Sequence, residues 1–96
     1  MNILIPINHE KKLCSINENS SWVVVTIDGG KTKKLEFFNT KDEIDKLIDY
    51  AIVISKDESI NDFFLDGMEV LIAPMQRSIE DIVEAYMFCE LNEVTS

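Results

Sequence analysis

The stretch Asn2–Ile7 (NILIPI) opens the chain with an apolar run that closes at a proline. Two later runs have the same character, Ala51–Ser55 (AIVIS) and Val70–Ala73 (VLIA). None of the three alternates polar with apolar residues, which is typical of strands that helices cover on both faces. We therefore predict an α/β fold in which the first stretch is the central strand and the two later runs lie beside it in parallel.

The segment after the first strand predicts a hairpin. Trp22–Ile27 and Lys34–Phe38 are rich in β-branched and aromatic residues, which favour strands. Between them Gly29 and Gly30 can adopt the positive φ angles that a tight reversal needs. The two strands should pair through a turn at these glycines.

Three cap patterns predict helices. Thr40 with Glu43 is a capping box, and we expect a helix from there to about residue 50. Ser59 with Asp62 repeats the pattern ahead of a helix of barely two turns, in which residues 60, 63 and 64 face the sheet. Ser78 should cap a last helix that runs to about residue 91.

These elements predict one domain over residues 1–96, with a three-layer fold around a five-stranded mixed sheet. An antiparallel meander precedes two right-handed parallel crossovers, the last through strand Glu69–Ala73. We expect Phe64 of the second helix and Ile82 of the final helix to pack against the sheet. Cys89 should lie on the apolar stripe of the final helix. Residues 92–96 should be a frayed tail.

Composition narrows the class of protein. The chain has 96 residues, of which 46% are hydrophobic and 28% charged, as in ordinary globular proteins. A net charge of −9 argues against binding to the phosphate backbone of nucleic acids. No segment has the apolar length of a membrane span, and no export signal is evident, so we expect a cytoplasmic protein with free thiols at Cys14 and Cys89.

The longest expected loop, Asn8–Ser20, is the first place to look for a ligand site. It carries His9, the only histidine of the chain, and Cys14. Imidazole and thiolate are ligands that suit iron, and the loop follows the carboxyl end of the predicted central strand, where α/β folds bind ligands. Two such ligands do not close a metal site, and a solvent-exposed histidine without a role is the common alternative.

The sequence does not predict an enzyme. A ribonuclease-type nuclease with this strand order needs carboxylates that converge on two metal ions, and the first strand offers only Asn2 and Asn8 as polar groups. Phosphate-binding glycine loops, zinc-protease motifs and serine-hydrolase motifs are all missing from the sequence.

Taken together, the segments MNILIPI, VVVTIDGGK, KKLEFFN, AIVIS, EVLIAP and SIEDIVEAYMFCEL resemble the dinitrogenase iron-molybdenum cofactor biosynthesis family, which includes NifX-like carriers. The resemblance covers nearly the whole chain and implies a ribonuclease H-like fold. It also implies a protein without catalysis that binds an iron-sulfur or iron-molybdenum cluster, or transfers it to a protein partner.

Members of that family carry a Ser-Pro-His-Phe-Gly run after the first strand. Here only Ser15 matches it, and the glycine-rich loop before the first helix is missing. The expected cofactor-binding residues are therefore His9, Cys14 and Ser15, with His9 and Cys14 as metal ligands. The alternative is a protein-interaction or regulatory module that binds no metal on the same fold. In either case we expect a monomer or weak homodimer.

Overall fold

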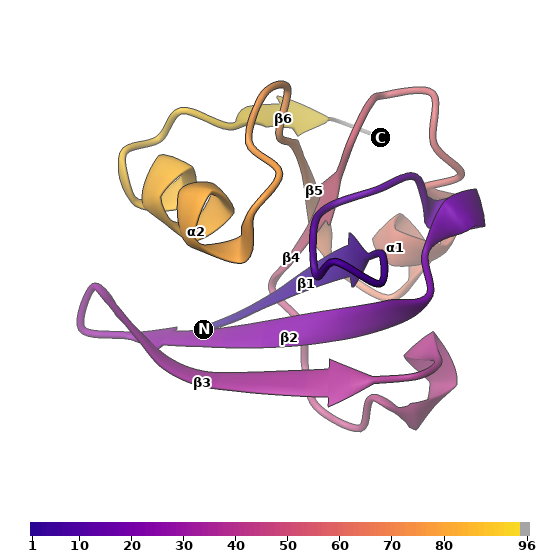
Figure 1. Ribbon diagram of the computed structural model, residues 1–96, viewed down its shortest axis with the longest axis horizontal. Coiled ribbons are helices and arrows are strands. Elements are labelled where there is room, and N and C mark those ends of the chain that lie inside the picture. Colours follow the sequence, from indigo (N-terminus) through magenta and orange to yellow (C-terminus); the bar gives the residue numbers. More distant parts are fainter. Residues whose placement is uncertain (95–96) are drawn as a thin grey trace.

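The chain's first strand, β1 (Asn2–Ile7), lies inside a six-stranded sheet in the computed structural model, which describes residues 1–94 (Figure 1). The other strands are β2 (Ser21–Asp28), β3 (Lys31–Phe38), β4 (Tyr50–Val53), β5 (Glu69–Ile72) and β6 (Asn92–Val94). They are arranged in the order β3-β2-β1-β4-β5-β6. The central position predicted for the first strand is confirmed.

The pairing directions make the sheet mixed, as predicted. Strand β1 runs antiparallel to β2 and parallel to β4, so that Leu4 lies between Val24 and Ala51. Strands β2 and β3 form the expected hairpin, and Gly29 and Gly30 turn it with φ angles of 61° and 75°. Strands β4 and β5 are parallel.

The sixth strand corrects the prediction of five strands and of a frayed tail from residue 92. Strand β6 pairs antiparallel with β5, with Val94 opposite Val70. Without it the backbone groups on that side of β5 would have no partner, and a three-residue strand is too short to show a period in the sequence. Residues 95 and 96 of the predicted tail lie outside the described residues.

The two faces of the sheet bury separate hydrophobic clusters. One cluster lies between the sheet and helix α2 (Ile79–Met87), and the other lies on the side of helix α1 (Asn61–Leu65). Alternate residues of β1 serve the two sides, since Ile3 and Ile5 belong to the first cluster and Leu4 to the second. This confirms the inference that both faces of the central strand are covered.

Helix α2 follows the prediction at its start and departs from it at its end. The Ser78 hydroxyl accepts a hydrogen bond from the backbone N–H of Asp81 at 3.1 Å, and Ile82 is fully buried. The helix ends at Met87, before the predicted end near Leu91. Cys89 lies beyond it with φ of 58° and is exposed, so its predicted place in the core is wrong.

Helix α1 is shorter than predicted and is capped differently. Its N-cap residue is Ile60, with no side-chain hydrogen bond, so the capping role predicted for Ser59 is wrong. Phe63 is the buried residue of the helix, while Phe64 is only partly buried against the same cluster.

The helix predicted from Thr40 to about Tyr50 is absent from the described chain apart from one 3₁₀ turn, Lys41–Glu43. The Glu43 carboxylate accepts a hydrogen bond from the N–H of Thr40 at 2.9 Å, so the predicted capping box is formed. The segment beyond, residues 44–50, contains two aspartates and two isoleucines, which are weak helix formers.

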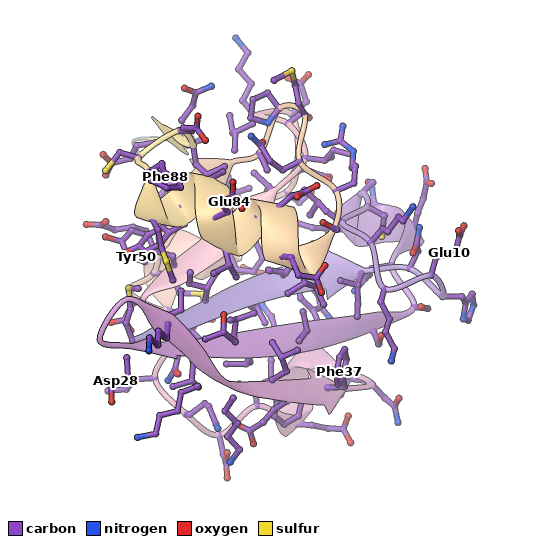
Figure 2. The ribbon with its side chains drawn as sticks, turned by 60° about the vertical axis from the view of Figure 1, so that its left-hand side comes forward. Glu10, Asp28, Phe37, Tyr50, Glu84 and Phe88 are labelled. Carbon is purple, nitrogen blue, oxygen red and sulfur yellow. The ribbon has the colours of Figure 1, made fainter. Side chains whose placement is uncertain are left out.

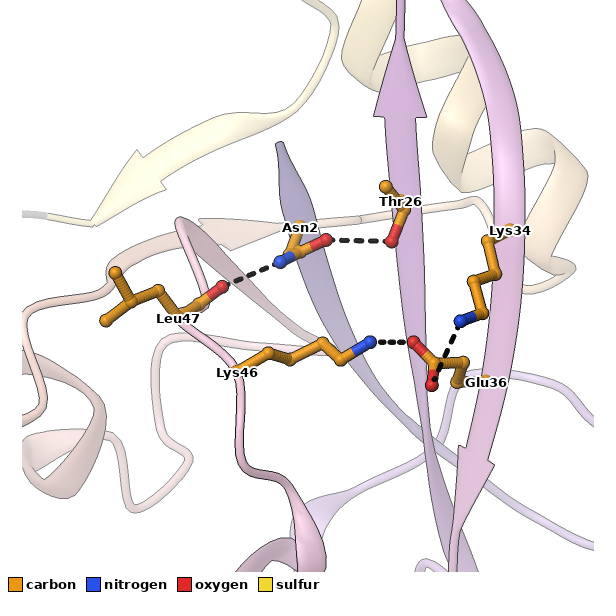
Figure 3. A network of polar contacts seen from close by, with 6 residues as sticks. All are labelled: Asn2, Thr26, Lys34, Glu36, Lys46 and Leu47. Atoms are coloured by element: carbon orange, nitrogen blue, oxygen red, sulfur yellow. Dashed lines mark hydrogen bonds and ion pairs between the residues drawn. The ribbon is translucent and has the colours of Figure 1, made fainter.

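Side chains of the sheet hold this segment in its non-helical path (Figure 3). The Asn2 amide donates to the Leu47 carbonyl and accepts from the Thr26 hydroxyl, both at 2.8 Å. Lys46 pairs with Glu36 of β3. Tertiary contacts therefore outweigh the capping box as a determinant of this segment's path.

Among the described helices, none has the length and apolar character to cross a membrane.

Candidate functional site

The loop after β1 is folded tightly at its start. The backbone N–H groups of Asn8 and Lys11 bond the carbonyls of Lys12 and Asn8, each at 2.9 Å. The Asn8 side-chain oxygen also accepts from the N–H of Glu10 and of Lys12. Such side-chain bonds are how asparagine stabilises a turn. They place His9 at an exposed tip just beyond the end of β1, as predicted.

Lys11 takes an uncommon backbone conformation in this turn. Its φ is 61°, in the left-handed region that residues other than glycine rarely adopt. The ammonium lies 4.9 Å from the centre of the Phe37 ring, within range of a cation–π interaction. This contact joins the turn after β1 to the last residues of β3.

An open crevice of about 450 Å³ lies beside this turn. The loop lines it with Asn8, His9 and Lys11, and the end of β3 lines it with Phe37. Ser21, the first residue of β2, and Ser20 before it also line the crevice. Its size is that of a small-ligand site, and it lies at the carboxyl end of the central strand, as predicted for a site.

The crevice lining is formally neutral, with one lysine and one glutamate, whereas the protein as a whole carries a charge of −9. Glu43 is the acid in its lining, and one carboxylate oxygen accepts from the N–H groups of Asn39 and Thr40 at 2.8 and 2.9 Å. The Lys11 ammonium and the His9 imidazole supply the groups that could bind an anion.

Cys14 lies apart from the crevice lining. Its side chain is only 9% exposed, whereas His9 is exposed. Burial raises the pKa of the Cys14 thiol, and the carboxylates of Glu18 and Glu58 raise it further. Metal ions bind the thiolate, so this environment disfavours ligation by Cys14.

Ser15 has a structural partner. Its hydroxyl donates to the Glu58 carboxylate at 3.2 Å, and the N–H of Ile16 donates to the other oxygen of that carboxylate at 3.0 Å. Glu58 thus fixes the loop through the 3₁₀ turn Ile16–Glu18. Whether Ser15 also contacts a cofactor stays a prediction.

Cys89 lines a second cavity, of about 400 Å³, at the amino-terminal end of β4. Tyr50 and Tyr86 meet there, with ring centres 5.2 Å apart. The hydrogen bond with Tyr86, with burial as the next cause, raises the pKa of Tyr50 to about 12. The cavity contains neither His9 nor Cys14.

The donor set near the crevice does not form a closed metal site. Across residues 1–94, no three side chains of histidine, cysteine, aspartate or glutamate come together in a way that could hold a metal ion. Of the two predicted metal ligands, only His9 lines the crevice.

Three residues important to this region carry no sequence signal of their own. Glu58 is 43 positions from Ser15, and only the fold brings them together. Lys11 and Phe37 read as an ordinary charged residue and an ordinary strand residue. A pattern search for chemical motifs cannot find contacts that depend on strand pairing.

The chain resembles solved structures and matches neither a protein-family model nor a curated protein sequence. A crystal structure from Methanocaldococcus jannaschii, described as that of "a putative dinitrogenase", superposes with a TM-score of 0.81 at 17% identity, covering 100% of this chain and 96% of that one. An NMR structure of the same protein gives 0.80 at 18% identity, covering 100% and 94%. The crystal structure of PH0822 gives 0.74 at 17% identity, covering 100% and 98%. The chain therefore has the fold of the M. jannaschii protein along its entire length, in agreement with the family resemblance in its sequence.

Proposed function

We propose that this protein is a non-enzymatic carrier of the dinitrogenase iron-molybdenum cofactor biosynthesis type. Its cargo would be an iron-sulfur or iron-molybdenum cluster that it passes to a protein partner. The observation that carries the proposal is the crevice that His9 and Lys11 line at the end of β1, in a chain with the fold of the M. jannaschii protein described as "a putative dinitrogenase".

The chemistry of the crevice suits temporary binding of such a cargo. Imidazole is a ligand for iron, and His9 offers it from an exposed turn. Clusters that carry sulfide and thiolate ligands are anionic, and the Lys11 ammonium beside His9 favours an anion. A cluster held by few protein ligands can be released to an acceptor.

The test is anaerobic reconstitution with iron and sulfide, followed by measurement of iron per chain and of the visible absorption spectrum. The variants are His9→Ala, Lys11→Gln and Cys14→Ala, with Cys89→Ala as the control for iron on an exposed thiol. We expect His9→Ala to lose the iron, Lys11→Gln to hold it more weakly, and Cys89→Ala to match the wild type.

Iron that is lost only in Cys89→Ala would place the binding outside the crevice. A wild type that takes up no iron, under conditions that load an authentic family member, would discard the carrier.

A second function is favoured by the surroundings of Cys14. The Cys14 thiol is buried and its pKa is raised, so one of the two predicted iron ligands is a poor ligand. If His9 alone does not bind iron, the protein is an interaction or regulatory module that binds no metal on the same fold. Wild-type protein that stays free of iron in the reconstitution supports this alternative.

A further inference from the structure

Strand β3 forms one edge of the sheet, because β2 is its only neighbour among the described strands. It is eight residues long, Lys31–Phe38, so it presents a row of backbone groups that a further strand could pair with. Leu35 and Phe37 lie opposite the buried residues Val25 and Val23 and so share the face that α2 covers elsewhere. They remain 42% and 47% exposed, and Figure 2 shows Phe37 at the rim of the sheet.

Charge is distributed unevenly along the chain. Residues 1–48 contain seven lysines and seven acids, whereas residues 49–96 contain two basic residues and eleven acids. The whole net charge of −9 thus arises in the second half. Three of the lysines, Lys31, Lys33 and Lys34, lie on β3 itself.

This charge pattern opposes pairing of β3 with a second copy of itself. Two edges would bring six lysines together with two copies of Glu36, whose carboxylate already pairs with Lys46 and Lys34 (Figure 3). The strand also has a bulge, since Lys34 lies opposite Thr26 while Thr32 lies opposite Ile27. Lysines and bulges on an edge strand are devices that prevent association of like strands.

We propose that the edge of β3 binds an extended acidic segment of another protein, which adds a seventh strand to the sheet. Carboxylates of the segment would meet the three lysines of β3, and its apolar side chains would cover Leu35 and Phe37. Backbone pairing supplies affinity in this mode of recognition, and side chains of the edge select the segment. The lysines that repel a second copy attract this partner.

The proposed surface continues into the crevice, because Phe37 belongs to both. A partner bound along β3 would therefore end beside His9 and Lys11. The inference goes beyond the proposed function, because it needs no cluster and holds equally for a module without metal. Failure of iron reconstitution and failure of strand binding are separate outcomes.

The experiment uses the full chain and a fluorescein-labelled peptide of about eight residues in which glutamate alternates with valine. Binding is followed by fluorescence anisotropy, and the site is mapped by amide chemical shifts. The control peptide replaces every glutamate with lysine. We expect saturable binding of the acidic peptide, shifts centred on residues 31–38, and at least roughly tenfold weaker binding on going from about 50 to 300 mM NaCl.

Two variants test the surface, and a third is the matched control. Lys31→Glu and Leu35→Glu should each weaken binding of the acidic peptide several-fold, while Lys56→Glu, the same charge change in the acidic half, should have little effect. Circular dichroism confirms that each variant is folded. Equal binding of both peptides, or shifts centred away from β3, overturns the proposal. A concentration-dependent dimer that Leu35→Glu abolishes also overturns it, because the edge would then serve a second copy.

Discussion

The ring of Phe63 meets the ring of Trp22 edge-on, with centroids 6.3 Å apart and planes at 83°. Edge-to-face contacts of this kind are favourable beyond the apolar area that they bury. The contact joins α1 to β2, and the Lys41 ammonium lies 5.1 Å from the centre of the same Phe63 ring. One side chain therefore connects three segments that are distant in the sequence.

Replacement of Phe63 by alanine should cost about 3 to 5 kcal/mol of unfolding free energy, because the ring is 2% exposed and a cavity would remain. Phe64 is only partly buried, so Phe64→Ala should cost clearly less. Urea denaturation of both variants measures the difference. Equal losses would mean that both rings fill the helix-to-sheet interface, as the sequence alone predicts.

On the other face, Ile82→Ala should cost about 2 to 5 kcal/mol, because Ile82 has no exposed surface between α2 and the sheet. Leu65→Ala in the other helix is the control, since Leu65 is 83% exposed and its loss should change stability by less than about 0.5 kcal/mol. A small loss for Ile82→Ala in the same denaturation measurement would contradict the packing described for this face.

The sheet was the predictable part of this fold, because its strands carry a strong local signal. A strand buried on both faces must be apolar throughout, and residues 3–5 and 51–53 satisfy this condition. The glycine pair that turns the hairpin has an equally local cause in its positive φ angles. Such features depend on neighbouring residues alone.

The segment after β3 was not predictable for the opposite reason. Its path is decided by bonds from Asn2 to Leu47 and from Lys46 to Glu36, all of which form only once the sheet exists. Cys89 has helical spacing from Ile82, yet α2 ends two residues before it. In both places a helix pattern yields to tertiary contacts or to an early helix end.

In the candidate site, too, features with a local cause were predictable and features that depend on distant contacts were not. The position of His9 beyond the end of β1 follows from the strand and was predicted. The residues on either side of Cys14, which lies outside the crevice lining, have partners that are distant in the sequence: the Leu13 N–H bonds the Arg77 carbonyl, and the Ser15 hydroxyl bonds Glu58. Residues that are close in one loop can thus face different surroundings.

Valine at Gly30 should destabilise the protein by at least about 1 kcal/mol, since a β-branched residue disfavours a φ of 75°. No heavy atom lies within 4 Å of the position where a side chain would begin, so the cost is one of backbone conformation and not of steric overlap. Gly30→Asn is the matched comparison, because asparagine tolerates the left-handed region and should cost less. Equal melting temperatures for the two variants would show that the turn has rearranged.

The two thiols should differ in their reaction with iodoacetamide, which attacks the thiolate. Cys89 is exposed, whereas Cys14 is buried and its pKa is raised by burial and by the carboxylates of Glu18 and Glu58. Mass spectrometry of alkylated native protein should therefore find Cys89 modified first. Equal rates of alkylation would contradict the described burial of Cys14.

Because the pKa of Cys14 is raised in the folded chain, the stability that it contributes is present below the ordinary thiol pKa of 9.0 and is lost as the pH rises through the folded value. Glu58→Gln removes one of the causes and should move the midpoint of the Cys14 alkylation rate to lower pH. If Glu58→Gln instead loosened the loop that holds Cys14, the alkylation rate at its high-pH plateau would rise. A shifted midpoint and a raised plateau therefore distinguish the electrostatic effect from the structural one. Asp57→Asn is the control, and it should leave the midpoint in place. An unchanged midpoint in Glu58→Gln would show that the Glu58 carboxylate does not raise the pKa of this thiol and would leave burial and Glu18 as its causes.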